Sequence, residues 1–170
     1  YGREMRRVLE AQGIETEGLL VQDQGWSTHV YTKAMQGDSE LNRVDFGNYN
    51  TLAPDTGAEL LGRLEALLPE LDCVIVNQQV RWGIHTEDFR RALVALIRRH
   101  PDKSFVADSR AHSNDLGGTL RKLNDREAAA LCGREIAPDG EVSAEAAREA
   151  GLSLFSRWGR PVVLTRGEHG

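Results

Sequence analysis

The sequence lacks the features of a cross-linked, metal-stapled or membrane-embedded protein. Among its 170 residues only two are cysteines, Cys73 and Cys132, and neither has a second Cys or a His at metal-ligand spacing. We therefore expect both to be thiols of the core in a reducing compartment. No apolar run approaches the length that spans a bilayer, and no signal peptide is visible, so we expect a cytoplasmic protein with no membrane partner.

An excess of basic residues is also absent. The chain has 21 Lys and Arg against 26 Asp and Glu, a net charge of −5. This balance argues against a nucleic-acid partner, since such binding is driven by counterion release at basic patches. It is compatible with a phosphorylated small ligand, which needs only a few local cations and backbone N–H groups.

Several familiar catalytic signatures are missing as well. There is no Gly-x-Ser-x-Gly elbow and no P-loop, and the five histidines show no paired metal spacing.

The chain opens at Tyr1 in a helical pattern and stops at Gly170 after a strand-like run. We therefore expect one domain over residues 1–170 that is incomplete at both ends.

What is present is a regular α/β pattern. A short helix is expected over residues 4–12, followed by two alternating runs at 27–35 and 41–46. The turn between these runs predicts an antiparallel hairpin with one polar face, over residues 26–47. After Pro54, helices alternate with strands at 73–76, 105–107, 120–123 and 162–164, and Thr56 and Glu59 are expected to form a capping box. The fold class predicted is α/β: a Rossmann-like, mostly parallel sheet with helices on both faces, in which residues 73–76 form a central strand.

Polar residues stand at the end of each expected strand. They are Asn77-Gln78-Gln79, Asp108-Ser109-Arg110, Asn124 with Glu127, and Thr165-Arg166-Gly167. In an open α/β sheet, ligands bind just past the carboxyl ends of the strands. The pattern therefore predicts a site for a charged ligand, and a metal-bound nucleotide is the first candidate.

Each strand end also has a purely structural interpretation. Asn124 and Glu127 can organise a hydrated Mg²⁺, or they can form a capping box for the helix that follows. Asp108 and Arg110 can bind a hydroxyl and a phosphate, or they can form a turn. The Thr165 tip can contact a phosphate or make a hairpin-type turn. The side-chain amides of Asn77, Gln78 and Gln79 can orient a polyol or belong to a polar loop.

Taken in order, these segments resemble one known family. The hairpin segments Tyr31-Thr32-Lys33 and Leu41-Asn42-Arg43-Val44-Asp45-Phe46 precede Asn77, Asp108, Lys122-Leu123-Asn124-x-x-Glu127 and Thr165-x-Gly167. This order is similar to that of the ribokinase-like (PfkB) carbohydrate kinases, and the hairpin looks most like the heptose-phosphate kinase branch. Ser109-Arg110 stands where that branch commonly has Pro-Lys, and Asn77 where it often has Ser-Asp, so the sugar stays open.

The resemblance implies a set of roles. Asn124 and Glu127 would organise Mg²⁺ and the phosphates of ATP, while Thr165, Gly167, Asp108 and Arg110 would serve the nucleotide and the reaction centre. Lys33, Arg43 and Asn77 would serve a sugar or sugar phosphate, under a hairpin that acts as a lid and pairs two subunits.

The family's Asp-Thr-x-Gly-Ala-Gly-Asp segment, with its catalytic base, would follow Gly170, and its glycine-rich sugar segment would precede Tyr1. The implied activity is transfer of the γ-phosphoryl group of Mg-ATP to a sugar hydroxyl, with this stretch alone inactive. The alternative is a non-catalytic module of the same fold that binds nucleotide or sugar.

Overall fold

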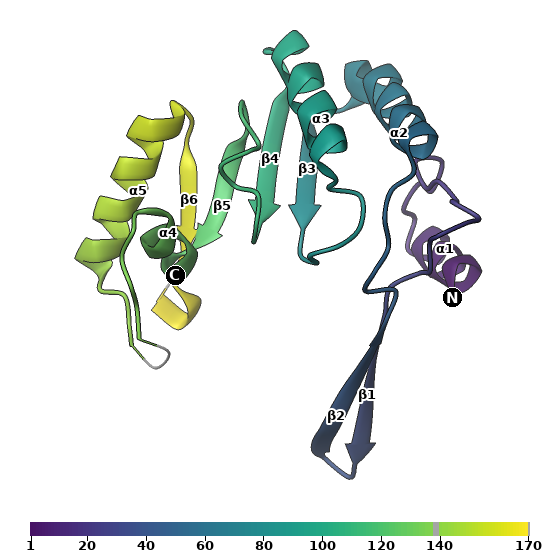
Figure 1. Cartoon of the computed structure of the whole chain (residues 1–170), viewed down its shortest axis with the longest axis horizontal. Coiled ribbons are helices and arrows are strands. Elements are labelled where there is room, and N and C mark those ends of the chain that lie inside the picture. The colour runs from purple at the N-terminus through teal and green to yellow at the C-terminus, as the bar shows by residue number, and fades with distance from the viewer. Residues whose placement is uncertain (138–139, 170) are drawn as a thin grey trace. The chain divides into compact units, whose positions relative to one another are not determined.

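The computed structural model describes residues 1–137 and 140–169 and divides the chain into two compact units. Unit 1 comprises Tyr1–Leu67 and Val80–Phe89, and unit 2 comprises Leu68–Gln79 and Arg90–Gly170. The fold is α/β, as predicted: a four-stranded, all-parallel sheet with flanking helices lies in unit 2, and a two-stranded antiparallel hairpin lies in unit 1 (Figure 1). None of the described helices is long and apolar enough to cross a membrane.

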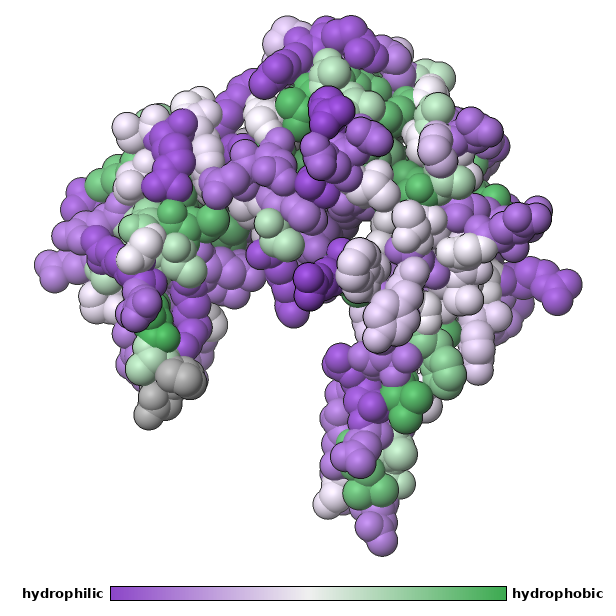
Figure 2. Space-filling view, viewed as in Figure 1, coloured by the Kyte–Doolittle hydropathy of each residue, from purple (hydrophilic) through white to green (hydrophobic). Residues whose placement is uncertain are grey.

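Unit 1 contains the predicted hairpin. Helix α1 (Gly2–Ala11) precedes strands β1 (Val30–Gln36) and β2 (Ser39–Phe46). The register pairs Val30 with Phe46 and Thr32 with Val44, so these apolar and β-branched side chains share one face. Val44 and Phe46 are about half exposed, and Figure 2 shows hydrophobic residues at the surface of the hairpin. The hairpin therefore carries an apolar face with little cover from the described residues.

Helix α2 (Pro54–Leu67) begins three residues earlier than the capping-box pattern predicted, which would have made Gly57 the first helical residue. Pro54 has no N–H to satisfy and its φ suits a helix, so it is well placed at the first helical position. The carbonyl of Ala53 already accepts the first helical bond, from Gly57 N at 2.9 Å. Thr56 and Glu59 thus lie inside the helix, and the predicted capping box there is wrong.

Unit 2 is built on strands β3 (Cys73–Gln78), β4 (Ser104–Ser109), β5 (Leu120–Asn124) and β6 (Val162–Thr165), in the order β3-β4-β5-β6. Helix α3 (Glu87–Arg99) connects β3 to β4, and α4 (Asp125–Leu131) and α5 (Ala144–Trp158) connect β5 to β6 (Figure 1). Two short 3₁₀ turns complete the elements, η1 (Leu68–Glu70) and η2 (Gly167–His169).

The strand order explains why one face of this sheet is left open. Right-handed crossovers between strands that are added in one direction place all connecting helices on the same side. On that side Leu123 packs with Ala128 and Leu154 of α4 and α5. On the other side Ile75 is 72% exposed and Val163 is 47% exposed. The expectation of helices on both faces is therefore wrong for unit 2, because the strand order never reverses.

Strand β3 is an edge strand of this sheet rather than the central strand that was predicted. Its side chains alternate between the covered face, with buried Val76, and the open face, with exposed Cys73 and Ile75. Both cysteines are free thiols, but only Cys132 is partly buried. The prediction of a core thiol is therefore wrong for Cys73, which starts an edge strand on its open face.

Candidate functional site

The carboxyl ends of the four parallel strands bring the predicted tips of unit 2 to one edge of the sheet. Asn77 is paired with Asp108, Asp108 with Lys122, and Asn124 with Thr165. Residues paired across parallel strands point to the same face, and so do residues two apart on one strand. All five residues therefore share the sheet face that the helices of unit 2 leave open.

Asn124 and Glu127 form a complete capping box at the start of α4. Asn124 Oδ1 accepts a hydrogen bond from Glu127 N at 2.7 Å, and Glu127 Oε2 accepts one from Asn124 N at 2.9 Å. The structural interpretation of this pair is thus confirmed. In this capping box only one carboxylate oxygen of Glu127 is used, and the other accepts no hydrogen bond from the described residues.

Asp108 forms an ion pair with Lys122 on the neighbouring strand, with Nζ 3.1 Å from Oδ2. Both side chains are about one-third exposed, so the pair is open to a ligand. Sequence reasoning quoted Lys122 in a motif without giving it a role. The structure shows that it supplies a cation beside Asp108 at the strand edge.

The end of β4 is held by a buried polar network. Ser109 Oγ donates to Gln78 Oε1 at 2.8 Å and accepts from His112 N at 2.9 Å, and Ala111 N donates to the same oxygen of Gln78 at 2.9 Å. Gln78 is buried, so it does not join Asn77 as an amide facing a ligand. This network orients the backbone on either side of Arg110, whose own side chain is exposed.

Arg121 is the residue that sequence reasoning missed. It is 2% exposed, and its guanidinium donates to the carbonyls of Ser113 (2.6 Å), Thr119 (3.3 Å) and Leu116 (2.9 Å). It also stacks over Trp158 at 4.1 Å from the ring centroid, and burial lowers the pKa of Arg121 to about 10. The sequence carries a signal for this burial. Arg121 is two residues from Leu123, so the side chains of both residues point to the same, covered face of β5.

The end of β6 offers backbone rather than side-chain groups. Thr165 Oγ1 donates a long hydrogen bond, 3.4 Å, to the carbonyl of Leu123. Gly167 has φ +56°, and a Cβ built there would meet no atom within 4 Å. A side chain would be strained at this φ, and the open space lets a ligand approach the backbone closely.

Lys33 and Arg43 lie in unit 1, on the polar face of the hairpin. They are register partners, and each has an acidic neighbour: Lys33 Nζ is 2.8 Å from Glu40 and Arg43 Nη2 is 2.8 Å from Asp45. Arg43 also lies over the ring of Tyr31 at 5.1 Å. A sugar phosphate at these cations would compete with their carboxylate partners.

No group of three or more His, Cys, Asp or Glu side chains that could hold a metal ion exists among the described residues. A dedicated protein cage is therefore absent from this part of the chain. Mg²⁺ bound with nucleotide phosphates does not need one, because it keeps several waters and takes one or two carboxylates. The unbonded oxygen of Glu127 fits that limited demand.

Comparison with known proteins adds no identification. No protein-family model matches the chain, and no curated protein matches it either.

Proposed function

We propose that this chain belongs to an ATP-dependent carbohydrate kinase, which transfers the γ-phosphoryl group of Mg-ATP to a hydroxyl of a sugar or sugar phosphate. The observation that supports the proposal is the arrangement of Asp108, Lys122, Asn124 and Thr165 at one edge and on one open face of a parallel sheet. That edge is where α/β sheets bind ligands. The order of the strand-end motifs, which resembles that of ribokinase-like kinases, supports the same conclusion.

Phosphoryl transfer requires positioning and charge neutralisation more than covalent chemistry. In the proposal Glu127, with Asn124, holds Mg²⁺ through waters, and the metal would neutralise charge on the phosphates. Lys122 supplies a fixed cation for a phosphate oxygen, and Asp108 keeps that ammonium in place at 3.1 Å. The open backbone at Gly167 receives the nucleotide, with Thr165 and Arg110 beside the phosphates.

Residues of the hairpin are also assigned roles in this proposal. Lys33 and Arg43 are assigned to a sugar phosphate and Asn77 to a sugar hydroxyl. The half-exposed apolar face with Val44 and Phe46 is assigned to a second subunit. An isolated two-stranded hairpin is marginal in water, so covering this face stabilises it. The free thiols of Cys73 and Cys132 agree with the cytoplasm as the place of action.

A second candidate is a non-catalytic module that binds nucleotide or sugar. It is favoured by the fact that the site side chains already have structural partners. Asn124 and Glu127 cap each other, and Asp108 is paired with Lys122. A site in which most polar side chains already hold the structure together can still bind phosphates without carrying a reaction.

The test is Mg-ATP binding to Glu127→Gln, measured by isothermal titration calorimetry with and without Mg²⁺. Glutamine retains the side-chain oxygen that accepts from Asn124 N, so the cap survives while the carboxylate charge is lost. We expect the Mg²⁺-dependent part of the affinity to fall by about tenfold, or about 1.4 kcal/mol. Glu145→Gln, an exposed change in the first turn of α5, is the matched control and should leave binding unchanged.

Phosphoryl transfer separates the two candidates. The longest natural protein that contains this chain is incubated with Mg-ATP and a panel of sugars and sugar phosphates, and sugar-dependent ADP release is measured. Sugar-dependent release supports the kinase, and Mg-ATP binding without release for any acceptor supports the binding module. Equal Mg²⁺-dependent affinity in Glu127→Gln and in the unaltered protein rules out the assigned site.

A further inference from the structure

One residue of β3, Gln78, holds three consecutive residues at the end of β4. Its side-chain oxygen accepts from the hydroxyl of Ser109 at 2.8 Å and from Ala111 N at 2.9 Å, while its main-chain carbonyl accepts from Arg110 N at 3.2 Å. Gln78 is 2% exposed and alternates with Val76 on the covered face of β3. It therefore serves the strand-end site only through the residues that it holds.

The loop that follows β4 is also fixed at its next residues. Ser109 Oγ accepts from His112 N at 2.9 Å, and Ser113 Oγ donates to the carbonyl of Ser109 at 2.7 Å. The carbonyl of Ser113 in turn accepts from Arg121 Nε at 2.6 Å. Ser109, Ser113 and Arg121 are all buried. The backbone around Arg110 is thus ordered by the protein itself, before any ligand binds.

Arg110 stands in the middle of this ordered segment with a free guanidinium. Its side chain is exposed, and the described residues give it neither a hydrogen bond nor an ion pair. Lys122, the other cation at the ends of β4 and β5, is already paired with Asp108. A guanidinium can donate two parallel hydrogen bonds to a phosphate, and binding is stronger when the group is held in place beforehand.

We propose that Gln78 is a positioning residue for phosphate binding: its buried amide fixes the backbone of Arg110 so that the guanidinium meets the phosphates of the nucleotide. The inference rests on the proposed function, in which Arg110 lies beside the phosphates of Mg-ATP. Without the Gln78 side chain, the Ser109 hydroxyl and Ala111 N lose their shared acceptor. Arg110 then has more conformational freedom to lose when the nucleotide binds, so the affinity falls.

A double-mutant cycle tests this role, with Mg-ATP affinity measured by isothermal titration calorimetry on the longest natural protein that contains this chain. The variants are Gln78→Met, Arg110→Ala and the two together, since methionine is similar in size and only a weak acceptor. We expect Arg110→Ala to lower the affinity about tenfold and Gln78→Met about fivefold. In the Arg110→Ala background, Gln78→Met should have no further effect, because it acts through Arg110.

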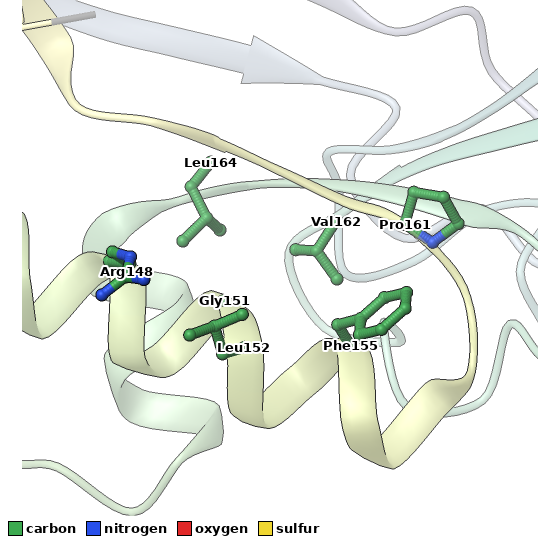
Figure 3. A pocket seen from close by; sticks show the side chains of 7 residues that line it. All are labelled: Arg148, Gly151, Leu152, Phe155, Pro161, Val162 and Leu164. Atoms are coloured by element: carbon green, nitrogen blue, oxygen red, sulfur yellow. The ribbon is translucent and has the colours of Figure 1, made fainter.

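Two control variants accompany the cycle. Thr119→Val removes a buried hydrogen bond, 2.9 Å to the carbonyl of Leu116, from the other end of the same loop and should leave the affinity unchanged. Arg148→Ala removes an exposed cation of α5 that borders the groove between α5 and β6 (Figure 3) and should also leave it unchanged. The first control measures the effect of loosening the loop, and the second measures the effect of losing one positive charge.

The outcomes separate this inference from the proposed function. If Arg110→Ala weakens binding but Gln78→Met does not, or if Gln78→Met has the same effect in both backgrounds, the positioning role is refuted and the nucleotide site stands. An equal loss in Thr119→Val refutes it as well. If Arg110→Ala changes nothing, or the unaltered protein does not bind Mg-ATP, the assigned nucleotide site fails and the positioning role fails with it.

Circular dichroism shows whether Gln78→Met is folded. If it is not, Ser109→Ala takes its place in the cycle, because it removes the hydroxyl that donates to Gln78 and leaves β3 unaltered. It should lower the affinity about threefold when Arg110 is present and not at all in Arg110→Ala. An equal effect in the two backgrounds again refutes the proposal.

Discussion

Replacing Arg121 by methionine tests the claim that a buried guanidinium holds the loop between β4 and β5. The side chain donates to the carbonyls of Ser113, Thr119 and Leu116 and stacks on Trp158. Methionine fills similar space and retains an apolar contact with the ring, but it donates no hydrogen bond. The three carbonyls would then be buried without this donor.

The expected magnitude follows from two opposing effects. Each buried carbonyl that loses its partner costs about 1–3 kcal/mol, and the lost cation–π contact costs about 2 kcal/mol when it is desolvated. Burying the charge of Arg121 is itself unfavourable, so its removal offsets part of this destabilisation. We expect a net loss of about 3–5 kcal/mol in the free energy of unfolding, a large share of the stability of an ordinary domain.

Urea denaturation followed by tryptophan fluorescence measures this loss. Trp158 is the only tryptophan of unit 2, since Trp26 and Trp82 belong to unit 1, so the signal can be assigned by comparison with a Trp158→Phe variant. Lys122→Met is the matched control, because it lies next along β5 on the open face and removes only a partly exposed ion pair. It should cost less than about 1 kcal/mol. Equal losses in the two variants would refute the anchoring role of Arg121.

The pH dependence provides an independent check. Burial lowers the pKa of Arg121 to about 10, well below the ordinary value that an arginine has in the unfolded chain. The unfolded state therefore binds the proton more tightly, and the contribution of Arg121 to stability rises only as the pH increases above about 10. The difference between the unaltered protein and Arg121→Met should thus stay constant from about pH 6 to pH 9. A slope within that window contradicts the assignment.

Two further predictions concern the cap and the thiols. Asn124→Ala removes the side-chain oxygen that accepts from Glu127 N, so it should lower the free energy of unfolding in urea by about 1 kcal/mol. Asn124→Asp retains an acceptor oxygen and should lower it only slightly. Equal losses in the two variants would contradict the capping geometry. Cys73 is exposed and Cys132 is partly buried with its thiol near the carbonyl of Ala150, so a thiol reagent added to the folded protein should modify Cys73 quickly and Cys132 slowly, with mass spectrometry locating the label. Faster labelling of Cys132 would show that α5 does not cover it.

Local pattern was enough to predict the elements that depend on near neighbours. The hairpin, the strands of unit 2 and the Asn124–Glu127 capping box all follow from residues a few positions apart, and the structure has each of them. The predicted start of α2 was three residues too late, because the helix begins at Pro54 and not after a cap at Thr56. Parallel strands also make it predictable that the ends of β3 to β6 meet at one edge.

Only the tertiary structure decided which side chains face one another there. The ion pair between Lys122 and Asp108 forms because the register of β4 and β5 places the two residues side by side. The hydrogen bond from Ser109 to Gln78 depends on the path of the loop after β4. The chain by itself determined its helices, strands and polar strand ends, because these are set by propensity and periodicity along a short stretch. The fold determined that β3 lies at an edge, that one sheet face stays open and that Arg121 is buried, because strand order and crossover direction arise from contacts between residues far apart in the sequence.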